Sequence, residues 1–161
     1  MEKHTFAVLV ENSPGVLSKV AGLFSRRGFN IDSLVVSETE DHTTSRMTIV
    51  VEGDSRVLEQ VGKQLNKQVD VIKVNDITEE ETVERQLCLI RVTTDDQNAR
   101  QEILQITEVF RCHVVDLGRK SLIVEATGDE AKVQAIIRAL RPFGITELVG
   151  TGKVAMIRGL Q

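Results

Sequence analysis

Aromatic residues are scarce in this chain, whose 161 residues include no Trp, no Tyr and only five Phe. Because 41% of the residues are hydrophobic, we still expect substantial cores, built from Val, Ile and Leu. The scarcity argues against a single-stranded RNA binder, since that function stacks bases on exposed aromatic side chains of a sheet. The predicted strand at 46–52 presents Met47, Ile49 and Val51 on one face instead.

An excess of positive charge is also missing. The chain has 24 acidic and 20 basic residues and a net charge of −4. Binding to nucleic-acid phosphates needs a basic surface, so we expect no nucleic-acid partner. The N-terminus has no apolar signal segment, and no run approaches the ~20 apolar residues of a membrane span. We therefore expect no membrane association and a cytoplasmic protein, or an organellar one if a transit peptide has been removed.

Cysteine and histidine are too few and too scattered to suggest a metal centre. Cys88 and Cys112 have neither CxxC nor zinc-ligand spacing, and none of the three His has a metal-compatible partner nearby in the sequence. Cys88 alternates with Leu87 and Leu89 in a predicted strand, which indicates a buried thiol. We expect no metal ligands and no catalytic residue.

The N-terminal half shows the element order βαββαβ, which is the ferredoxin-like arrangement. Ser13 is predicted to cap the first helix, with Pro14 at its first position, and Gly28 to end it. Asp54 is predicted to cap the second helix, and Asp129 to cap the corresponding helix of the C-terminal half. Strands are expected over residues 6–10, 31–38, 46–52 and 69–74.

The C-terminal half repeats this order. Gly53-Asp54 and the apolar stripe after it match Gly128-Asp129 and its stripe at a constant offset of 75. The polar stretch from Asn75 to Glu84 is predicted to be an exposed linker. The expected fold is α+β, with two tandem ferredoxin-like domains: residues 1–77 as the first, 78–84 as linker and 85–161 as the second.

The turn from Glu11 to Gly15 carries the strongest functional signal. It is predicted to aim free backbone N–H groups and a helix N-terminus at one point, which suits an anionic head group. Gly15 leaves room for a ligand to approach the backbone, and Asn12 offers a donor and an acceptor. The corresponding turn of the second half, Thr93–Asp96, has no glycine and two carboxylates. A well-capped helix start is the other interpretation of the turn.

Four segments of the N-terminal half are distinctive in combination: VLVENSPG at 8–15, GLFSRRGFN at 22–30, SRMTI at 45–49 and VLEQVGKQL at 57–65. Together they resemble the regulatory small subunit of acetolactate synthase, also called acetohydroxyacid synthase. The first ~80 residues are similar to an ACT domain, a ferredoxin-like amino-acid-binding module, and the second half matches more loosely.

The resemblance implies a non-catalytic chain that carries no cofactor. Its partner would be a separate catalytic subunit with thiamine diphosphate, a divalent metal and FAD, which makes 2-acetolactate for branched-chain amino-acid synthesis. The small subunit would activate that enzyme, confer feedback inhibition by L-valine and form a homodimer through its ACT domains. Valine would lie across the dimer interface, bound by Asn12, Gly15, Val16 and Leu17 of one chain and Asn30 and Ile31 of the other.

One departure and two alternatives stay open at this point. Ser13-Pro14 stands where many relatives have an acidic or polar pair, and proline removes an N–H, so the number of amides facing the ligand is an open question. A freestanding ACT-type sensor of some other enzyme is the strongest alternative. A small ferredoxin-like hydrolase is a weaker one, because the turn contains no arginine.

Overall fold

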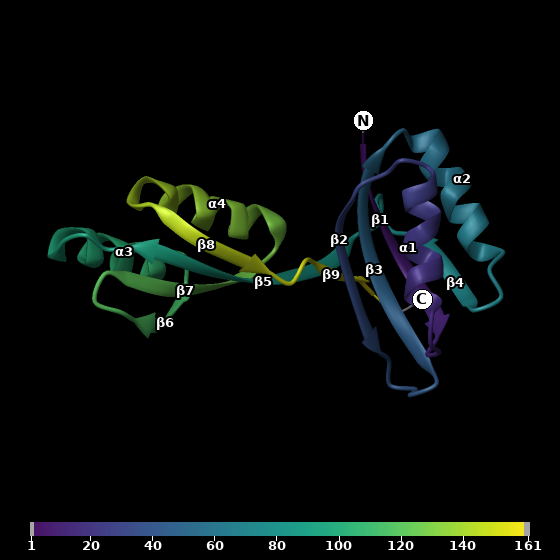
Figure 1. Cartoon of the computed structure of the whole chain (residues 1–161), viewed down its shortest axis with the longest axis horizontal. Coiled ribbons are helices and arrows are strands. Elements are labelled where there is room, and N and C mark those ends of the chain that lie inside the picture. The colour runs from purple at the N-terminus through teal and green to yellow at the C-terminus, as the bar shows by residue number, and fades with distance from the viewer. Residues whose placement is uncertain (1, 160–161) are drawn as a thin grey trace. The chain divides into compact units, whose positions relative to one another are not determined.

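The computed structural model describes residues 2–159 and confirms two ferredoxin-like units (Figure 1). The first unit comprises the chain up to Val83 together with the segment from Val154 onward. The second comprises Glu84–Lys153. Each unit is described below by itself.

The first unit is a four-stranded antiparallel sheet with two helices. Its strand order is β2-β3-β1-β4, which leaves β2 and β4 as edge strands. All three pairings are antiparallel, as βαββαβ topology requires. The elements are β1 (Glu2–Glu11), α1 (Val16–Arg26), β2 (Ile31–Glu38), β3 (Thr44–Gly53), α2 (Ser55–Asn66) and β4 (Val71–Asp76).

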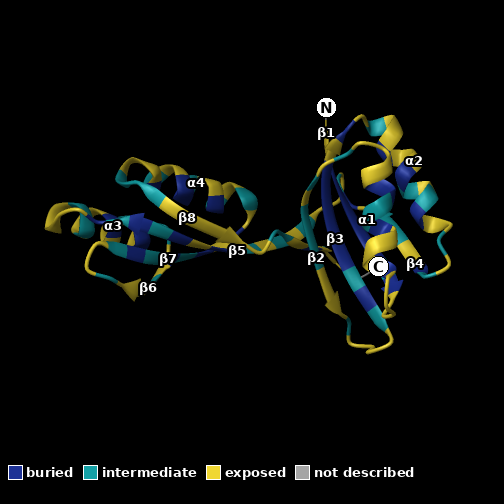
Figure 2. Cartoon of the chain, in the orientation of Figure 1, coloured by how far each residue is buried: buried dark blue, intermediate teal, exposed yellow. Residues whose placement is uncertain are grey.

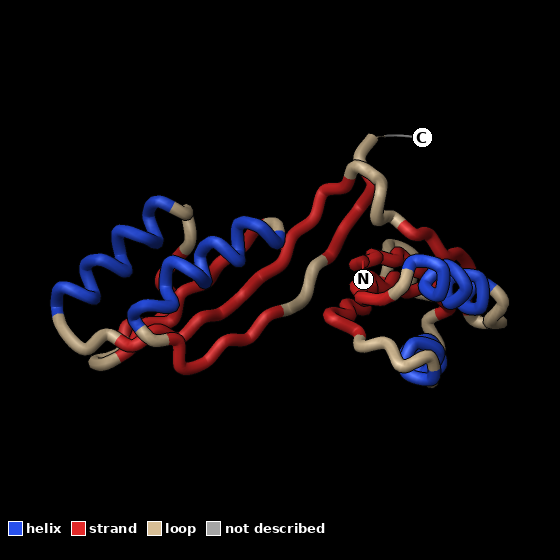
Figure 3. The backbone as a smooth tube through the Cα atoms, turned by 90° about the horizontal axis from the view of Figure 1, so that it is seen from above, coloured by secondary structure: helices blue, strands red, loops and turns tan. Residues whose placement is uncertain are grey.

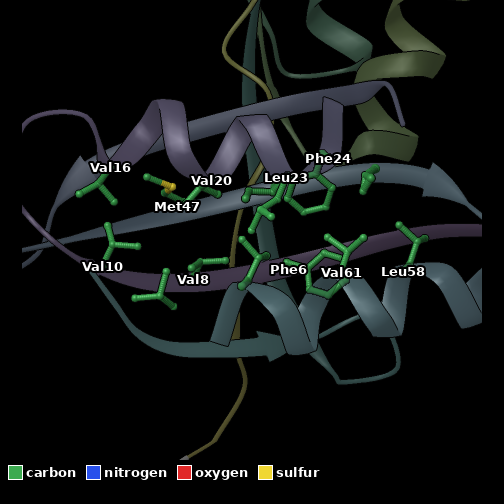
Figure 4. Close-up of a cluster of buried hydrophobic side chains, with 14 residues drawn as sticks. Phe6, Val8, Val10, Val16, Val20, Leu23, Phe24, Met47, Leu58 and Val61 are labelled. Atoms are coloured by element: carbon green, nitrogen blue, oxygen red, sulfur yellow. The ribbon is translucent and has the colours of Figure 1, made fainter. Parts of the chain in front are cut away.

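The core of this unit lies between the helices and one face of the sheet. Alternate residues of β1 and β3 face the helices, because Phe6 pairs with Ile49 and Val8 with Met47 in the strand register. Figure 4 shows α1 and α2 side chains beside those of β1, and Figure 2 shows the buried stretches of each element. The predicted stripe of α2 is confirmed, since these residues are fully buried: Leu58, Val61 and Leu65.

The opposite face of the sheet is partly covered by the C-terminal strand β9 (Val154–Ile157). Ala155 is buried with Ala7 and Ile77, and Ile157 packs against this cluster. The predicted domain division therefore differs from the observed one near the C-terminal end, because β9 packs on the first unit. The sequence did not predict this strand, because the residues on which it packs lie far away in the sequence.

The second unit repeats the topology of the first. Its strand order is β6-β7-β5-β8, and β9 also pairs with β5. β5 begins at Thr82, inside the segment predicted as linker. Figure 3 shows the helices and strands of the second unit on the backbone trace. The elements are β5 (Thr82–Thr93), α3 (Gln97–Val109), β6 (His113–Leu117), β7 (Ser121–Gly128), α4 (Glu130–Leu140), a 3-10 turn (Arg141–Phe143) and β8 (Ile145–Gly150).

The two predicted aspartate caps are confirmed. Asp54 accepts a hydrogen bond from the Arg56 N–H, and Asp129 accepts one from the Lys132 N–H. The capped helices, α2 and α4, are the pair related by the offset of 75 residues. Side-chain capping of free N–H groups at these two positions therefore fixes where both helices begin.

Candidate functional site

The turn between β1 and α1 centres on Gly15, which is the N-cap residue of α1. Its φ is +85°, in the left-handed region that favours glycine. The predicted cap at Ser13 was wrong, because Gly15 is the N-cap residue and α1 has no side-chain cap. The Ser13 N–H donates to the Glu11 carbonyl at 3.0 Å. A Cβ built on Gly15 would meet no atom within 4 Å, so the backbone here faces open space.

The N-terminus of α1 presents free backbone donors. The first helical bond runs from the Lys19 N–H to the Gly15 carbonyl at 3.1 Å. Within residues 2–159, the N–H groups of Gly15, Val16 and Leu17 donate no hydrogen bond of ordinary geometry. The first turn also has no acidic side chain. Free donors and the positive end of the helix dipole together favour an anion at this point.

Asn12 is fixed beside these donors by three contacts. Its N–H bonds the Thr43 carbonyl at 2.8 Å. Its Nδ2 donates to Glu38 Oε1 at 3.2 Å and to the His42 carbonyl at 3.0 Å. Both partners of Nδ2 can only accept, so this atom is the amide nitrogen and Oδ1 is left free to accept from a ligand.

The turn between β2 and β3 therefore lies directly beside the Gly15 turn, because Asn12 bonds Glu38 and His42. Asp41 stabilises it, because hydrogen bonds from the Thr43 hydroxyl and N–H hold the pKa of its carboxyl below the ordinary value. His42 Nδ1 lies 3.0 Å from Glu38 Oε2. Sequence reasoning did not connect Glu38 and His42 with the site, and the only available signal was their place in the polar hairpin that follows the second strand.

Val16 and Leu17 contribute differently to the site. The Val16 side chain is buried in the core, so only its N–H is accessible to a ligand. Leu17 is 46% exposed and is the accessible apolar side chain of the first helical turn.

Asn30 and Ile31 lie away from this turn within the same chain. Asn30 is exposed, and Ile31 packs against the core at the start of β2. Asn12 contacts Glu38, at the end of β2. The eight residues of β2 span about 26 Å in extended conformation. One small ligand therefore cannot contact both Asn12 and Asn30 of the same chain.

Comparison with known proteins decides the family. Residues 6–73 match the model of the AHAS small subunit-like ACT domain, and residues 85–159 match that of the small subunit of acetolactate synthase. A probable acetolactate synthase small subunit from Archaeoglobus fulgidus is 61% identical over 157 residues, covering 98% of each chain. This chain belongs to the family of acetolactate synthase small subunits.

Two further similarities extend across the small subunit. The acetolactate synthase small subunit from Mycobacterium bovis is 49% identical and covers 97% of this chain, with 92% of its own length matched. The crystal structure of the small subunit from Thermotoga maritima has a TM-score of 0.86, with 43% identity and complete coverage of both chains. The predicted family and fold are confirmed over both units.

The corresponding turn of the second unit of this small subunit is closed. Asp96 caps α3 by accepting from the Ala99 N–H at 2.7 Å. Arg100 Nη2 donates to the Gly118 carbonyl at 2.6 Å and to Thr94 Oγ1 at 3.2 Å. A ligand carboxylate would meet the Asp96 carboxylate where the first unit offers free N–H groups, so the open turn belongs to the first unit.

None of the helices within residues 2–159 of this small subunit is both long and apolar enough to cross a membrane. No group of three or more His, Cys, Asp or Glu side chains in the same residues is arranged to hold a metal ion.

Proposed function

We propose that this chain is a regulatory partner, without catalytic activity of its own, of an acetolactate synthase catalytic subunit. It raises the activity of that subunit and makes it sensitive to feedback inhibition by L-valine. The family supports the partner, and one observation supports the effector: free N–H groups at the start of α1 beside Gly15, where the backbone faces open space. The partner carries the thiamine diphosphate, divalent metal and FAD.

The groups around Gly15 are complementary to an amino acid. The ligand carboxylate accepts from the N–H groups of Gly15, Val16 and Leu17, at the positive end of the helix dipole. Its ammonium donates to Asn12 Oδ1 and lies near the Glu38 carboxylate, which Asn12 already contacts. The exposed Leu17 side chain offers an apolar surface to a short aliphatic side chain.

A second copy of the chain completes this site. β2 is an edge strand whose outer backbone groups are available for pairing. If β2 pairs antiparallel with β2 of a second copy across a two-fold axis, the Ile31 end of one strand lies beside the Glu38 end of the other. Asn30 and Ile31 of one chain then reach the Gly15 turn of its neighbour, and the homodimer holds two equivalent sites.

Reconstitution with the matching catalytic subunit tests this function. We expect the isolated chain to show no acetolactate synthase activity, to raise that of the catalytic subunit and to make it inhibitable by valine. Turnover by the rigorously purified chain would contradict the regulatory role. Valine binding without any effect on the catalytic subunit would instead support a freestanding ACT-type sensor of another enzyme.

A further inference from the structure

β9 packs on the sheet face opposite the helices of the first unit, although the chain reaches it only after passing through the second unit. Its side chains alternate: Ala155 is buried against Ala7 and Ile77, whereas Val154 and Met156 are 48% and 66% exposed. The small Ala155 side chain lets the strand lie close to the sheet. Ala155 and Ile157 therefore pack in a defined apolar cluster of the first unit.

Arg46 fixes β9 to the sheet. Its Nη2 donates to the Ala155 carbonyl at 2.6 Å, and this bond is partly buried. Hydrogen bonds that involve a charged donor are about twice as strong as neutral ones. Among the side-chain hydrogen bonds of residues 2–159, this one joins β3 to β9. Arg46 thus connects the central sheet to the segment that returns from the second unit.

Arg46 also lies close to the proposed effector site. In the strand register it pairs with Leu9 on one side and Ser37 on the other. Glu38, the next residue along β2, is the carboxylate that Asn12 Nδ2 contacts at 3.2 Å. Glu38 of the proposed site therefore directly follows Ser37, the residue of β2 that pairs with Arg46.

We propose that β9, held by Arg46, transmits effector binding at the Gly15 turn to the second unit. This inference rests on the proposed function. β9 has a seated state, with Ala155 in its cluster and bonded by Arg46, and a released state. Effector binding changes the balance between these states because it acts on β2 and β3 next to Arg46. The covalent chain through residues 150–153 carries the change to β8.

Two variants test the transmission in the reconstituted holoenzyme. Arg46→Met removes the hydrogen bond but keeps an apolar stem, and Ala155→Asp places a carboxylate in the apolar cluster, which expels β9. In both we expect the chain still to bind valine and to activate the catalytic subunit, while the maximal inhibition by saturating valine falls at least fivefold. Arg46→Lys keeps a charged donor and should restore part of the sensitivity. Met156→Ser, on the exposed face of the same strand, is the matched control and should leave inhibition unchanged.

Hydrogen exchange in the wild-type chain tests the same inference without any variant. Saturating valine should change the exchange of the amides at 154–158 at least fivefold, within the range of typical couplings between sites. Unchanged exchange at 154–158, or normal inhibition in both Arg46→Met and Ala155→Asp, would overturn the transmission role while leaving the effector site intact. A wild-type chain that binds no valine would overturn the proposed function, and this inference with it.

Discussion

Gly15 is the residue on which the proposed effector site most depends. Its positive φ places the start of α1 so that three N–H groups remain free, and no atom lies within 4 Å of where its side chain would be. The sequence predicted this residue and Asn12, because glycine and asparagine in a strand-to-helix turn have a direct chemical meaning. It did not predict Glu38 and His42, which only the pairing of β2 with β3 brings to Asn12.

Gly15→Asp should abolish the valine response. The new carboxylate lies where the ligand carboxylate should bind, and like charges at ~4 Å cost about 1–4 kcal/mol between water and a surface-like dielectric. We expect valine affinity by calorimetry to fall at least tenfold, which takes about 1.4 kcal/mol. Gly15→Asn is the matched control for the backbone, since asparagine also tolerates positive φ and adds no charge. Equal affinity in folded Gly15→Asp and wild-type protein would place the site elsewhere.

The two thiols should react slowly in the native chain. Cys88 and Cys112 are buried, as the alternation around Cys88 predicted, and burial raises the pKa of both thiols. A raised pKa lowers the thiolate fraction at neutral pH, and the thiolate is the reactive form. Labelling with a thiol reagent at pH 7 should therefore be much slower than in the unfolded chain. Equally fast labelling of either cysteine in both states would contradict the buried positions.

At the scale of elements, the predictions that held were those with a local cause. The caps at Asp54 and Asp129 and the apolar stripes after them follow from residues within one or two turns. The start of α1 was mispredicted because Ser13 looks like a cap, although here the left-handed Gly15 takes that position. β9 was missed because its partners, including Arg46, lie far away in the sequence.

Asp129→Ala should destabilise the second unit by about 1 kcal/mol, the usual cost of losing a helix cap. The lost bond is the one accepted from the Lys132 N–H at 2.8 Å. Unfolding in guanidinium chloride, followed by circular dichroism, measures the change. Asp129→Asn keeps an acceptor at the same position and should cost much less. If the two variants were equally destabilised, the loss would come from the charge and not from the cap.

At the scale of the whole molecule, each unit has its own core. The chain passes between the units twice, because it leaves the first unit after Val83 and returns to it at β9. The core cluster of the first unit contains no residue beyond Val71, and that of the second unit lies entirely between Cys88 and Leu140. The sequence predicted two domains correctly because each half closes a βαββαβ unit. It could not predict the return of β9, since nothing local indicates that a segment packs on the other half.

A fragment ending at Val83 should fold, because its core cluster is complete without β9. Loss of β9 exposes Ala7 and Ile77, which should cost about 1–2 kcal/mol at ~25 cal/mol per Å² of apolar surface. We expect the fragment to retain part of the activation and to lose some feedback sensitivity. Circular dichroism and denaturant unfolding test its stability, and an unfolded fragment would show that the two units depend on each other.

The central claim is that two copies of the chain share each effector site, and complementation tests it most directly. Gly15→Asp damages the turn of its own chain, and Asn30→Ala removes the side chain lent to the neighbour. We predict that neither mutant homodimer binds valine like the wild type. A purified heterodimer of one chain of each kind keeps one intact Gly15 turn opposite one intact Asn30, so calorimetry should recover one valine per dimer. A heterodimer that binds no valine, or an Asn30→Ala homodimer that binds like the wild type, would contradict the shared site.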